Sequence, residues 1–202
     1  MTRQTPVGAT PVPWAAVFGN DGPVEVEIGP GRGELLLAYA TAAPTTNFFA
    51  IERAARAAAA VMEKAVARRL ANVRVVAGDA RCIIARLVPD ASVAAYHLYF
   101  PDPWPKRRHR ARRLNEPSFA GELVRTLTRG GVLHLASDLR SLVDDFALLL
   151  AAAGLVPEPG ATPPAGRPTT AFERKYAQAG THYACLVRPQ ATGAPAPVRA
   201  EG

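Results

Sequence analysis

The sequence predicts an α/β fold with a mostly parallel sheet and helices on both of its faces. Short apolar runs alternate with longer segments of helical periodicity, which is typical of parallel strands joined by crossover helices. A turn with three glycines follows the first apolar run directly and precedes a helical pattern. The 202 residues are enough for one domain with a substantial core and too few for two ordinary domains.

Five strands are expected in the central region, and a sixth towards the end of the chain. Each is a short apolar run bounded by turn residues, as buried strands are. The five lie near Val24–Ile28, Phe48–Ile51, Val73–Ala77, Ala94–Phe100 and Gly131–Ala136. The sixth, Tyr183–Arg188, is expected to pair antiparallel at the edge of the sheet.

Helices are expected to fill most of the intervals between the strands. The segment Ala54–Leu70 is rich in alanine. Its residues Met62, Val66 and Leu70 are four apart and indicate one apolar stripe that packs against the sheet. A second helix, Leu139–Ala153, is expected to stop at the glycine that follows it.

Three segments lack any regular pattern. Residues 156–168 read VPEPGATPPAGRP and are expected to form a loop, because prolines fix φ and remove amide donors. Residues 1–22 and 189–202 are expected to be flexible ends. The folded domain is therefore expected to span residues 23–188.

The positive charge of the chain is concentrated in one block. The formal net charge is +7 and the pI is about 10.0, but six basic residues within eight positions account for all but one of these charges. A local patch of this kind favours directed binding of a polyanion such as nucleic acid. The six are Lys106, Arg107, Arg108, Arg110, Arg112 and Arg113.

The chain has the composition of a soluble cytoplasmic protein. Its two cysteines, Cys82 and Cys185, are far apart in sequence and lack metal-ligand spacing, so no metal is expected. The start of the chain has no secretory pattern. No segment approaches the run of roughly 18 apolar residues that a membrane span needs.

Three acids stand within or directly after the first three strands, beside the glycine turn. The stretch VEVEIGPGRGELL places Glu27 before Gly29, Gly31 and Gly33. Glycines permit close approach of the backbone to a ligand, and the helix that follows offers free N–H groups. Two more acids, Glu52 and Asp79, end the second and third strands; Glu52 lies where such folds hold a ribose diol.

Other interpretations of these residues remain open. The glycines could form a tight structural turn without a ligand, and each acid could be a helix cap or a solvated side chain. NAD is also a candidate ligand, although its fingerprint is GxGxxG and this turn reads GPGRG.

The fourth strand leads into FPDPWPKRRHRARR, which joins an acid and an aromatic ring to the basic block. Prolines restrict the backbone on both sides of Asp102, whose carboxylate could accept hydrogen bonds from N1–H and N2–H of guanine. Trp104 could stack on the base, and the block Lys106–Arg113 could contact phosphates, with His109 as a further contact. A structural turn with a buried tryptophan and a solvated basic loop are the alternatives.

Two resemblances follow from these motifs. The turn GPGRG with its three acids resembles motif I and the cofactor acids of the Rossmann-like S-adenosylmethionine-dependent methyltransferases. The stretches EIGPGRGE, IER, GDA, FPDPWPKRRHRARRL, SD and TAFERK resemble, in order and spacing, the tRNA (guanine-N7-)-methyltransferase family over roughly residues 24–188. The family implies a seven-stranded Rossmann-like sheet with an antiparallel edge strand, and methyl transfer to N7 of a guanine in the variable loop of tRNA.

The resemblance also implies roles for individual residues. It makes Asp102 catalytic and tRNA the partner of a monomer or homodimer. The implied S-adenosyl-L-methionine contacts are Glu27, Gly29, Gly31, Gly33, Glu52, Arg53, Asp79, Ala80 and Asp102. The implied substrate contacts are Trp104, Lys106, His109, Arg112, Arg113, Asp138, Thr170 and Glu173.

The chemistry expected at such a site needs no general base, because N7 of guanine carries a lone pair and no proton. A carboxylate, Asp102 or Glu173, could stabilise the positive charge that appears on the purine. A methyltransferase acting on another RNA, a protein or a small molecule, and a noncatalytic RNA-binding protein, are the alternative functions.

Overall fold

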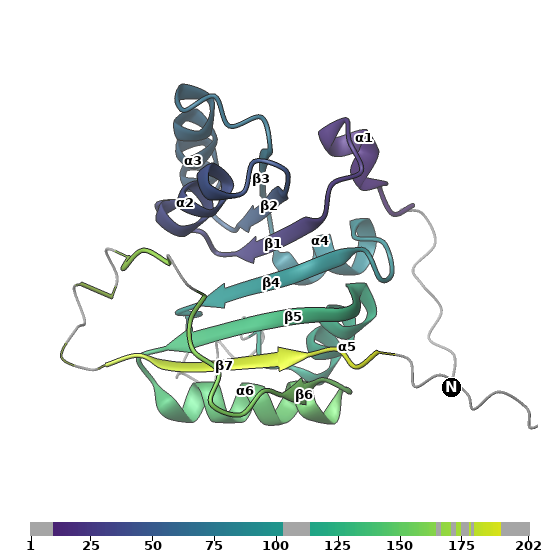
Figure 1. Cartoon of the computed structure of the whole chain (residues 1–202), viewed down its shortest axis with the longest axis vertical. Coiled ribbons are helices and arrows are strands. Elements are labelled where there is room, and N and C mark those ends of the chain that lie inside the picture. Colours follow the sequence, from purple (N-terminus) through teal and green to yellow (C-terminus); the bar gives the residue numbers. More distant parts are fainter. Residues whose placement is uncertain are drawn as a thin grey trace, which may run out of the picture.

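The computed structural model describes residues 10–102, 114–164, 167–170, 173–174, 178 and 180–190. Within them, a seven-stranded sheet runs in the order β3-β2-β1-β4-β5-β7-β6 (Figure 1). The strands β1 to β5 pair in parallel, whereas β7 runs antiparallel to both of its neighbours. The strands are β1 (Val24–Ile28), β2 (Asn47–Glu52), β3 (Val73–Ala77), β4 (Val93–Tyr99), β5 (Leu127–Ser137), β6 (Val156–Pro157) and β7 (His182–Val187).

The mostly parallel sheet is confirmed, with one difference at its antiparallel side. The outermost strand is the two-residue β6, and β7 lies between it and β5. The predicted loop 156–168 therefore begins with two strand residues. Pro157 is compatible with this place, because an edge strand has a side on which no amide donor is needed. The amide of Glu158 then donates to the carbonyl of Cys185 at 2.9 Å.

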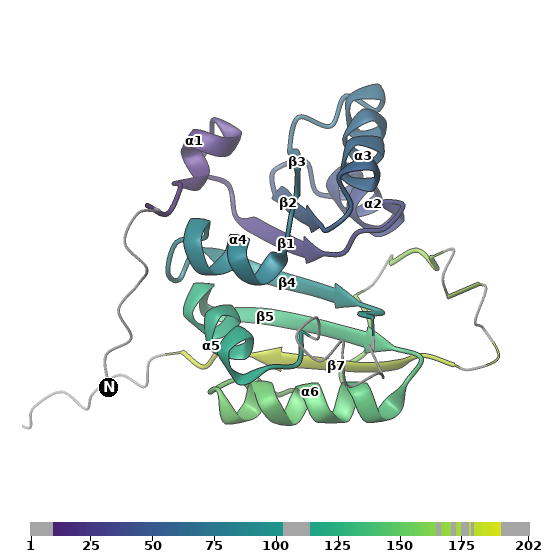
Figure 2. The same ribbon diagram turned by 180° about the vertical axis from the view of Figure 1, so that it is seen from behind.

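Helices cover both faces of the sheet, as expected. Figures 1 and 2 show α2 and α3 beside β1 to β3, and α4, α5 and α6 on the opposite face. None of the described helices is long and apolar enough to span a membrane. The helices are α1 (Trp14–Phe18), α2 (Glu34–Ala42), α3 (Ala55–Ala67), α4 (Ala80–Leu87), α5 (Pro117–Thr126) and α6 (Arg140–Ala152).

The core has two main parts, one on each face. On the face of α4 to α6, the sheet residues Val26, Leu98 and Leu135 are buried with Leu123 and Phe146 of the helices. On the other face, β2 and β3 pack against α2 and α3 through a smaller cluster. The alternation of side chains along β1 leaves Glu25 and Glu27 on this second face.

Helix α1 lies in a segment that the sequence suggested to be flexible. The Trp14 ring packs 5.1 Å from that of Phe49, and its indole N–H donates to Ser92 Oγ at 3.0 Å. Phe18 is buried in the same part of the core. A helix of five residues is too short to show periodicity, so only these tertiary contacts reveal it.

The apolar stripe predicted for α3 is confirmed in part. Met62 and Leu70 are partly buried against the cluster of β2 and β3, whereas Val66 is 66% exposed. The fully buried residues of α3 are Ala58, Val61 and Ala65. Residues four apart drift around a helix of 3.6 residues per turn, and the alanines allow α3 to lie close to the glycine turn. An ideal Cβ placed on Gly33 would come within 2.7 Å of Val61 Cγ1.

One part of the sheet is covered by a loop. On the face that carries α2 and α3, no helix of the described residues lies over β5 and β7 (Figure 1). The chain after β6 crosses there, and the guanidinium of Arg167 stacks on the Tyr99 ring with Cζ 4.7 Å from its centroid. This crossing brings Arg167 and Thr170 to the carboxyl edge of the sheet.

Gly33→Ala should destabilise the fold. Gly33 has φ +75°, which L-residues adopt at a cost of about 1–2 kcal/mol, and the added Cβ would clash with Val61. Urea denaturation should show a loss of about 2 kcal/mol or more in the free energy of unfolding. The matched control is Gly121→Ala, where a Cβ in α5 meets no atom within 4 Å and should stabilise the helix by about 0.5–1 kcal/mol. Equal effects of the two substitutions would contradict this account of Gly33.

Candidate active site

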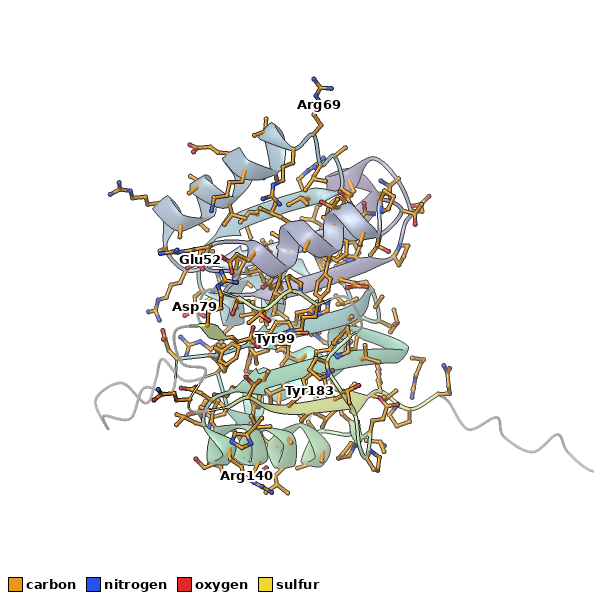
Figure 3. The ribbon with its side chains drawn as sticks, turned by 60° about the vertical axis from the view of Figure 1, so that its left-hand side comes forward. Glu52, Arg69, Asp79, Tyr99, Arg140 and Tyr183 are labelled. Atoms are coloured by element: carbon orange, nitrogen blue, oxygen red, sulfur yellow. The ribbon has the colours of Figure 1, made fainter. Side chains whose placement is uncertain are left out.

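Two adjoining cavities lie at the carboxyl ends of β1 to β4. The smaller has a volume of about 240 Å³ and the larger about 490 Å³. They share the residues Gly29, Tyr99, Phe100 and Asp102. Figure 3 shows Glu52, Asp79 and Tyr99 on this side of the molecule. The predicted site residues on the smaller cavity are Gly29, Glu52, Arg53, Asp79, Ala80 and Asp102, and those on the larger are Glu27, Gly29, Gly31, Asp102 and Thr170.

The glycine turn provides a backbone cradle for a ligand. Gly29 and Gly31 have φ of +74° and +55°, which favours glycine over any residue with a side chain. An ideal Cβ at either position meets no atom within 4 Å. Both glycines line the larger cavity, so a side chain there would extend into the space that a ligand needs.

Glu52 ties the end of β2 to the glycine turn. Its Oε1 accepts from the amide of Ala54 at 3.0 Å, and its Oε2 lies 3.4 Å from the amide of Gly31. A carboxylate has about four acceptor positions, so these two bonds leave capacity for the hydroxyls of a ligand. Glu52 therefore fits the predicted contact with a ribose diol.

Asp79 is both a helix cap and a cavity residue. Its Oδ1 accepts from the Arg81 amide at 3.0 Å, which caps α4. The guanidinium of Arg81 pairs with the same carboxylate at 2.5 Å, and this hydrogen bond is the main reason that the pKa of Asp79 is lowered. Asp79 and Arg81 both line the smaller cavity. Asp79 therefore has both of the roles that the sequence allowed: it caps α4 and it lies in the predicted site.

Glu27 is a buried acid on the wall of the larger cavity. Only 5% of its surface is exposed. Burial raises its pKa to about 8, although the charge of Arg167 and a hydrogen bond from the amide of Leu36 act in the opposite direction. The side chain is therefore mostly protonated at neutral pH in this structure.

The turn after β4 is strained at the point where the two cavities meet. Phe100 has φ +51°, which is rare for a bulky residue. Its amide donates to the carbonyl of Ala136 at 2.7 Å, which holds this conformation. The chain then passes through Pro101 to the exposed carboxylate of Asp102 on the shared wall. Such strain is concentrated at functional sites.

Thr170, on the wall of the larger cavity, is joined to Glu173 by reciprocal hydrogen bonds. Thr170 donates from its amide to Glu173 Oε2 at 2.8 Å, and the Glu173 amide donates to Thr170 Oγ1 at 3.2 Å. Arg167 Nη1 pairs with Glu173 Oε1 at 2.8 Å, and both side chains are 8% exposed. At the far end, Arg174 pairs with Glu34 of α2 at 3.2 Å.

Three buried polar atoms near Glu27 have no hydrogen-bond partner in the described structure. They are Nε and Nη2 of Arg167 and the hydroxyl of Tyr39. The Tyr39 hydroxyl lies beside that of Tyr99 but does not reach it with hydrogen-bond geometry. An unpaired buried donor costs about 1–3 kcal/mol, so these atoms require an explanation.

Some predicted residues lie away from the cavities or outside the described residues. Gly33 is the N-cap of α2 and packs on Val61. Glu173 accepts a hydrogen bond from the hydroxyl of Thr170 and lines neither cavity. Asp138 follows β5, accepts from Ser137 Oγ at 3.2 Å, and lines neither cavity. The predicted substrate residues outside the described part of the chain are Trp104, Lys106, His109, Arg112 and Arg113.

Sequence reasoning missed four residues of the site. Tyr99 and Phe100 separate the cavities, and Arg81 lines the smaller one. Arg167 pairs with Glu173 from within a segment predicted as a loop. The end position of the fourth strand was a usable signal for Tyr99, whereas nothing in the stretch around Arg167 distinguishes it from a solvated arginine.

The fold and the cavity together define a class of protein. A glycine cradle after β1, acids in or after β1 to β3 and an antiparallel β7 are the features of a Rossmann-like methyltransferase. A family model described as a putative methyltransferase matches residues 21–186. A tRNA (guanine-N(7)-)-methyltransferase of Nitrosococcus oceani is 37% identical over 175 residues, covering 86% of this chain and 74% of the relative. The chain belongs to the tRNA (guanine-N(7)-)-methyltransferase family.

Other relatives and solved structures agree with this assignment. The enzyme of the same name from Klebsiella pneumoniae is 38% identical over 176 residues, covering 82% of this chain and 71% of its own. The 16S rRNA methyltransferase KamB has a TM-score of 0.64 at 17% identity, covering 87% and 91% of the two chains. The [4+2]-cyclase SpnF has a TM-score of 0.58 at 16% identity, covering 87% and 78%. These structural likenesses confirm the fold alone.

The raised pKa of Glu27 predicts how stability depends on pH. Between its unfolded value of 4.5 and its folded value of about 8, the unfolded state loses a proton that the folded state keeps. Relative to Glu27→Gln, the free energy of unfolding of the ligand-free protein should therefore fall by up to about 1.4 kcal/mol per pH unit in this window and level off above it.

Urea denaturation of both proteins from pH 4 to pH 9 measures this difference. The control is Glu63→Gln, a substitution at an exposed position of α3, whose curve should run parallel to that of the unsubstituted protein. A parallel curve for Glu27→Gln would instead mean that Glu27 titrates normally.

Proposed function

We propose that this chain transfers the methyl group of S-adenosylmethionine to N7 of a guanine in tRNA. The observation that carries the proposal is the position of Asp102. It lies on the wall shared by the two cavities, the smaller of which is also lined by Glu52 and Asp79. Methyl transfer needs its two reactants in line at one point, and this wall is where ligands of the two cavities would meet. Relatives named for this reaction at 35–38% identity support it.

The smaller cavity suits the adenosine part of the cofactor. Glu52 would accept from the ribose hydroxyls, and Asp79 with Ala80 and Arg53 would lie beside the adenine. The methionine part would then extend along Gly29 and into the larger cavity, towards Glu27 and Gly31.

The residues of the chain position and stabilise; none needs to accept a proton. When bound, adenosylmethionine supplies a methyl group activated by a positive sulfur. The N7–carbon bond would form from the lone pair of N7 as the sulfur–carbon bond breaks, S-adenosylhomocysteine would leave, and positive charge would move from sulfur to the purine. The carboxylate of Asp102 would hold the base and stabilise this charge, while the strained turn at Phe100 fixes the position of the carboxylate.

The remaining parts of the proposal concern tRNA. The larger cavity, at about 490 Å³, would receive the guanine, with Thr170 on its wall and Glu173 behind it. The basic block from Lys106 to Arg113 would contact the phosphates of the variable loop, Trp104 would stack on the base, and Asp138 would complete the substrate set. We place the activity in the cytoplasm, on a domain of residues 23–188, in a monomer or homodimer.

A labelling experiment tests the activity. The protein is incubated with unmodified tRNA and methyl-labelled adenosylmethionine, and the labelled nucleotide is mapped. Label at N7 of a guanine in the variable loop supports the proposal. Label on a small molecule or on ribosomal RNA, or tRNA binding without label, would replace it by the alternative methyltransferase or by a noncatalytic RNA-binding protein.

Asp102→Ala should reduce methylation about 10²- to 10³-fold, the range typical for loss of one electrostatic contact to a transition state. The dissociation constant for the cofactor should change less, because Glu52 and Asp79 remain. Single-turnover rates and calorimetry with adenosylmethionine measure the two effects. Asp144→Ala, at an exposed position of α6, is the control and should change neither. Equal loss of rate and cofactor affinity would refute the assigned role of Asp102.

Neutralising Arg112 and Arg113 should weaken tRNA binding and reduce its salt dependence. The slope of log K against log salt should fall by about 0.7–0.9 for each lost phosphate contact. Filter binding of Arg112→Gln/Arg113→Gln across a salt series measures the slope. The same change at Arg68 and Arg69, which directly follow α3, should leave the slope unaltered; Figure 3 shows Arg69 far from Asp79. An unchanged slope in the first variant would mean that the block does not contact phosphate.

A further inference from the structure

Arg167 is a buried cation with one unused edge. Its side chain is 8% exposed. Nη1 donates to Glu173 Oε1, whereas Nε and Nη2 are buried and have no partner among the described residues. In a guanidinium, the N–H groups of Nε and Nη2 point the same way and form a fork. We call this pair of donors the open edge of Arg167. Its two N–H groups have the spacing at which a carboxylate accepts two parallel hydrogen bonds.

The guanidinium is held in place by contacts that leave this edge unused. Its face lies over the Tyr99 ring, with Cζ 4.7 Å from the ring centroid. The Tyr99 hydroxyl is itself 3.2 Å from Nδ1 of His97, which fixes the ring. Glu173, which takes the Nη1 side, is anchored by Thr170. The arginine is therefore oriented in advance, which reduces the entropy that a ligand would have to overcome.

Arg167 does not itself line the larger cavity, but it lies next to residues that do. The charge of Arg167 acts on Glu27 and on the hydroxyls of Tyr39 and Tyr99. Of these residues, Glu27 and Tyr99 line the larger cavity, as does Thr170, three positions after Arg167. The unpaired hydroxyl of Tyr39 adds a third donor to the same neighbourhood. Beside the ion pair with Glu173, Arg167 and Tyr39 together offer three buried polar atoms without partners among the described residues, and such a set of donors suits a small anion.

We propose that the open edge of Arg167, assisted by the Tyr39 hydroxyl, binds the α-carboxylate of the methionine part of the cofactor. The inference rests on the proposed function, which places the methionine part along Gly29 and Gly31 in the larger cavity. A phosphate of RNA is a poorer match, because these donors are buried and a backbone phosphate approaches from the surface. A small cofactor in the larger cavity would already contact Glu27, Tyr99 and Thr170, the neighbours of Arg167, so only a local shift would bring its carboxylate to these donors.

The segment that carries Arg167 must shift slightly when the carboxylate arrives, because its donors are covered in this structure. The ion pair Arg174–Glu34, which ties the segment to α2, can yield at little cost. Its side chains are 59% and 33% exposed, and exposed pairs contribute little to stability. Arg174→Gln is therefore a useful control, since it loosens the same segment and leaves the open edge intact.

The test compares ligands with and without the carboxylate. Calorimetry is run with adenosylmethionine, with decarboxylated adenosylmethionine and with 5′-methylthioadenosine. The unsubstituted protein should bind adenosylmethionine about 10- to 100-fold more tightly than its decarboxylated form. In Arg167→Gln this preference should fall to about twofold or less, while methylthioadenosine binds as before. Arg167→Lys, which keeps the charge but not the fork, should show an intermediate preference.

The ratio of the two affinities is measured within each variant, so a general weakening of the fold cancels. Arg174→Gln should keep the full preference. An undiminished preference in Arg167→Gln would overturn the proposal, and loss of tRNA affinity in that variant would then assign Arg167 to the RNA. If Arg167→Gln weakened the binding of all three ligands equally, the proposal would also be overturned, because such a result would indicate a purely structural role for Arg167. Failure of the unsubstituted protein to bind any of the ligands would instead refute the proposed function.

Discussion

The parallel pairing of β1 with both β2 and β4 is the constraint on which the site depends. Ile28 lies opposite Ile51 on one side and Leu98 on the other, and Glu52 lies opposite Ala77 of β3. The carboxyl ends of these four strands therefore reach the same edge of the sheet. The chain builds outwards from β1 in one direction and from β4 in the other, so the loops after them diverge and leave a crevice. The glycine turn, the acids and Asp102 are brought together by this order of strands.

Three features that cost stability lie at or beside that crevice. Phe100 adopts a left-handed conformation, Glu27 is a buried acid with a raised pKa, and Arg167 keeps two donors unpaired. Away from it, Arg69 and Ala91 also have positive φ, while most side chains on the faces of the sheet are apolar and pack against helices. Under the proposals above, each of these features concerns a group that would meet a ligand: a backbone turn that positions a carboxylate, an acid beside a cation, and a cation that pairs with Glu173 on one side only. The strain thus has a functional interpretation that packing alone does not provide.

The sequence was sufficient for most features that depend on where a strand ends. The strands Val24–Ile28 and Val73–Ala77 were predicted to the residue, because a glycine directly follows each of them. The places of Glu52 and Asp79 followed from the ends of β2 and β3.

Features that depend on distant contacts could not be predicted. Helix α1 is held by the contact of Trp14 with Phe49, and β6 by its pairing with β7. The pairing of Arg167 with Glu173 appears only after the chain crosses the sheet. The exposure of Val66 has the same origin, since the contact of Val61 with Gly33 helps to set which face of α3 is buried.

The fold by itself leaves the chemistry undecided, since a [4+2]-cyclase shares it as closely as several methyltransferases do. What separates these chemistries must lie in side chains at the carboxyl edge. Under the proposed function, Glu52 and Asp79 would contact parts of adenosylmethionine that do not react, so they could serve any protein that binds this cofactor. The turn at Phe100 and Asp102 would be different, because it would set where a carboxylate stands relative to a base in the larger cavity. A nitrogen that already has its lone pair needs no general base. On this proposal the reaction would therefore depend on the geometry of the turn more than on the acid–base properties of any one residue.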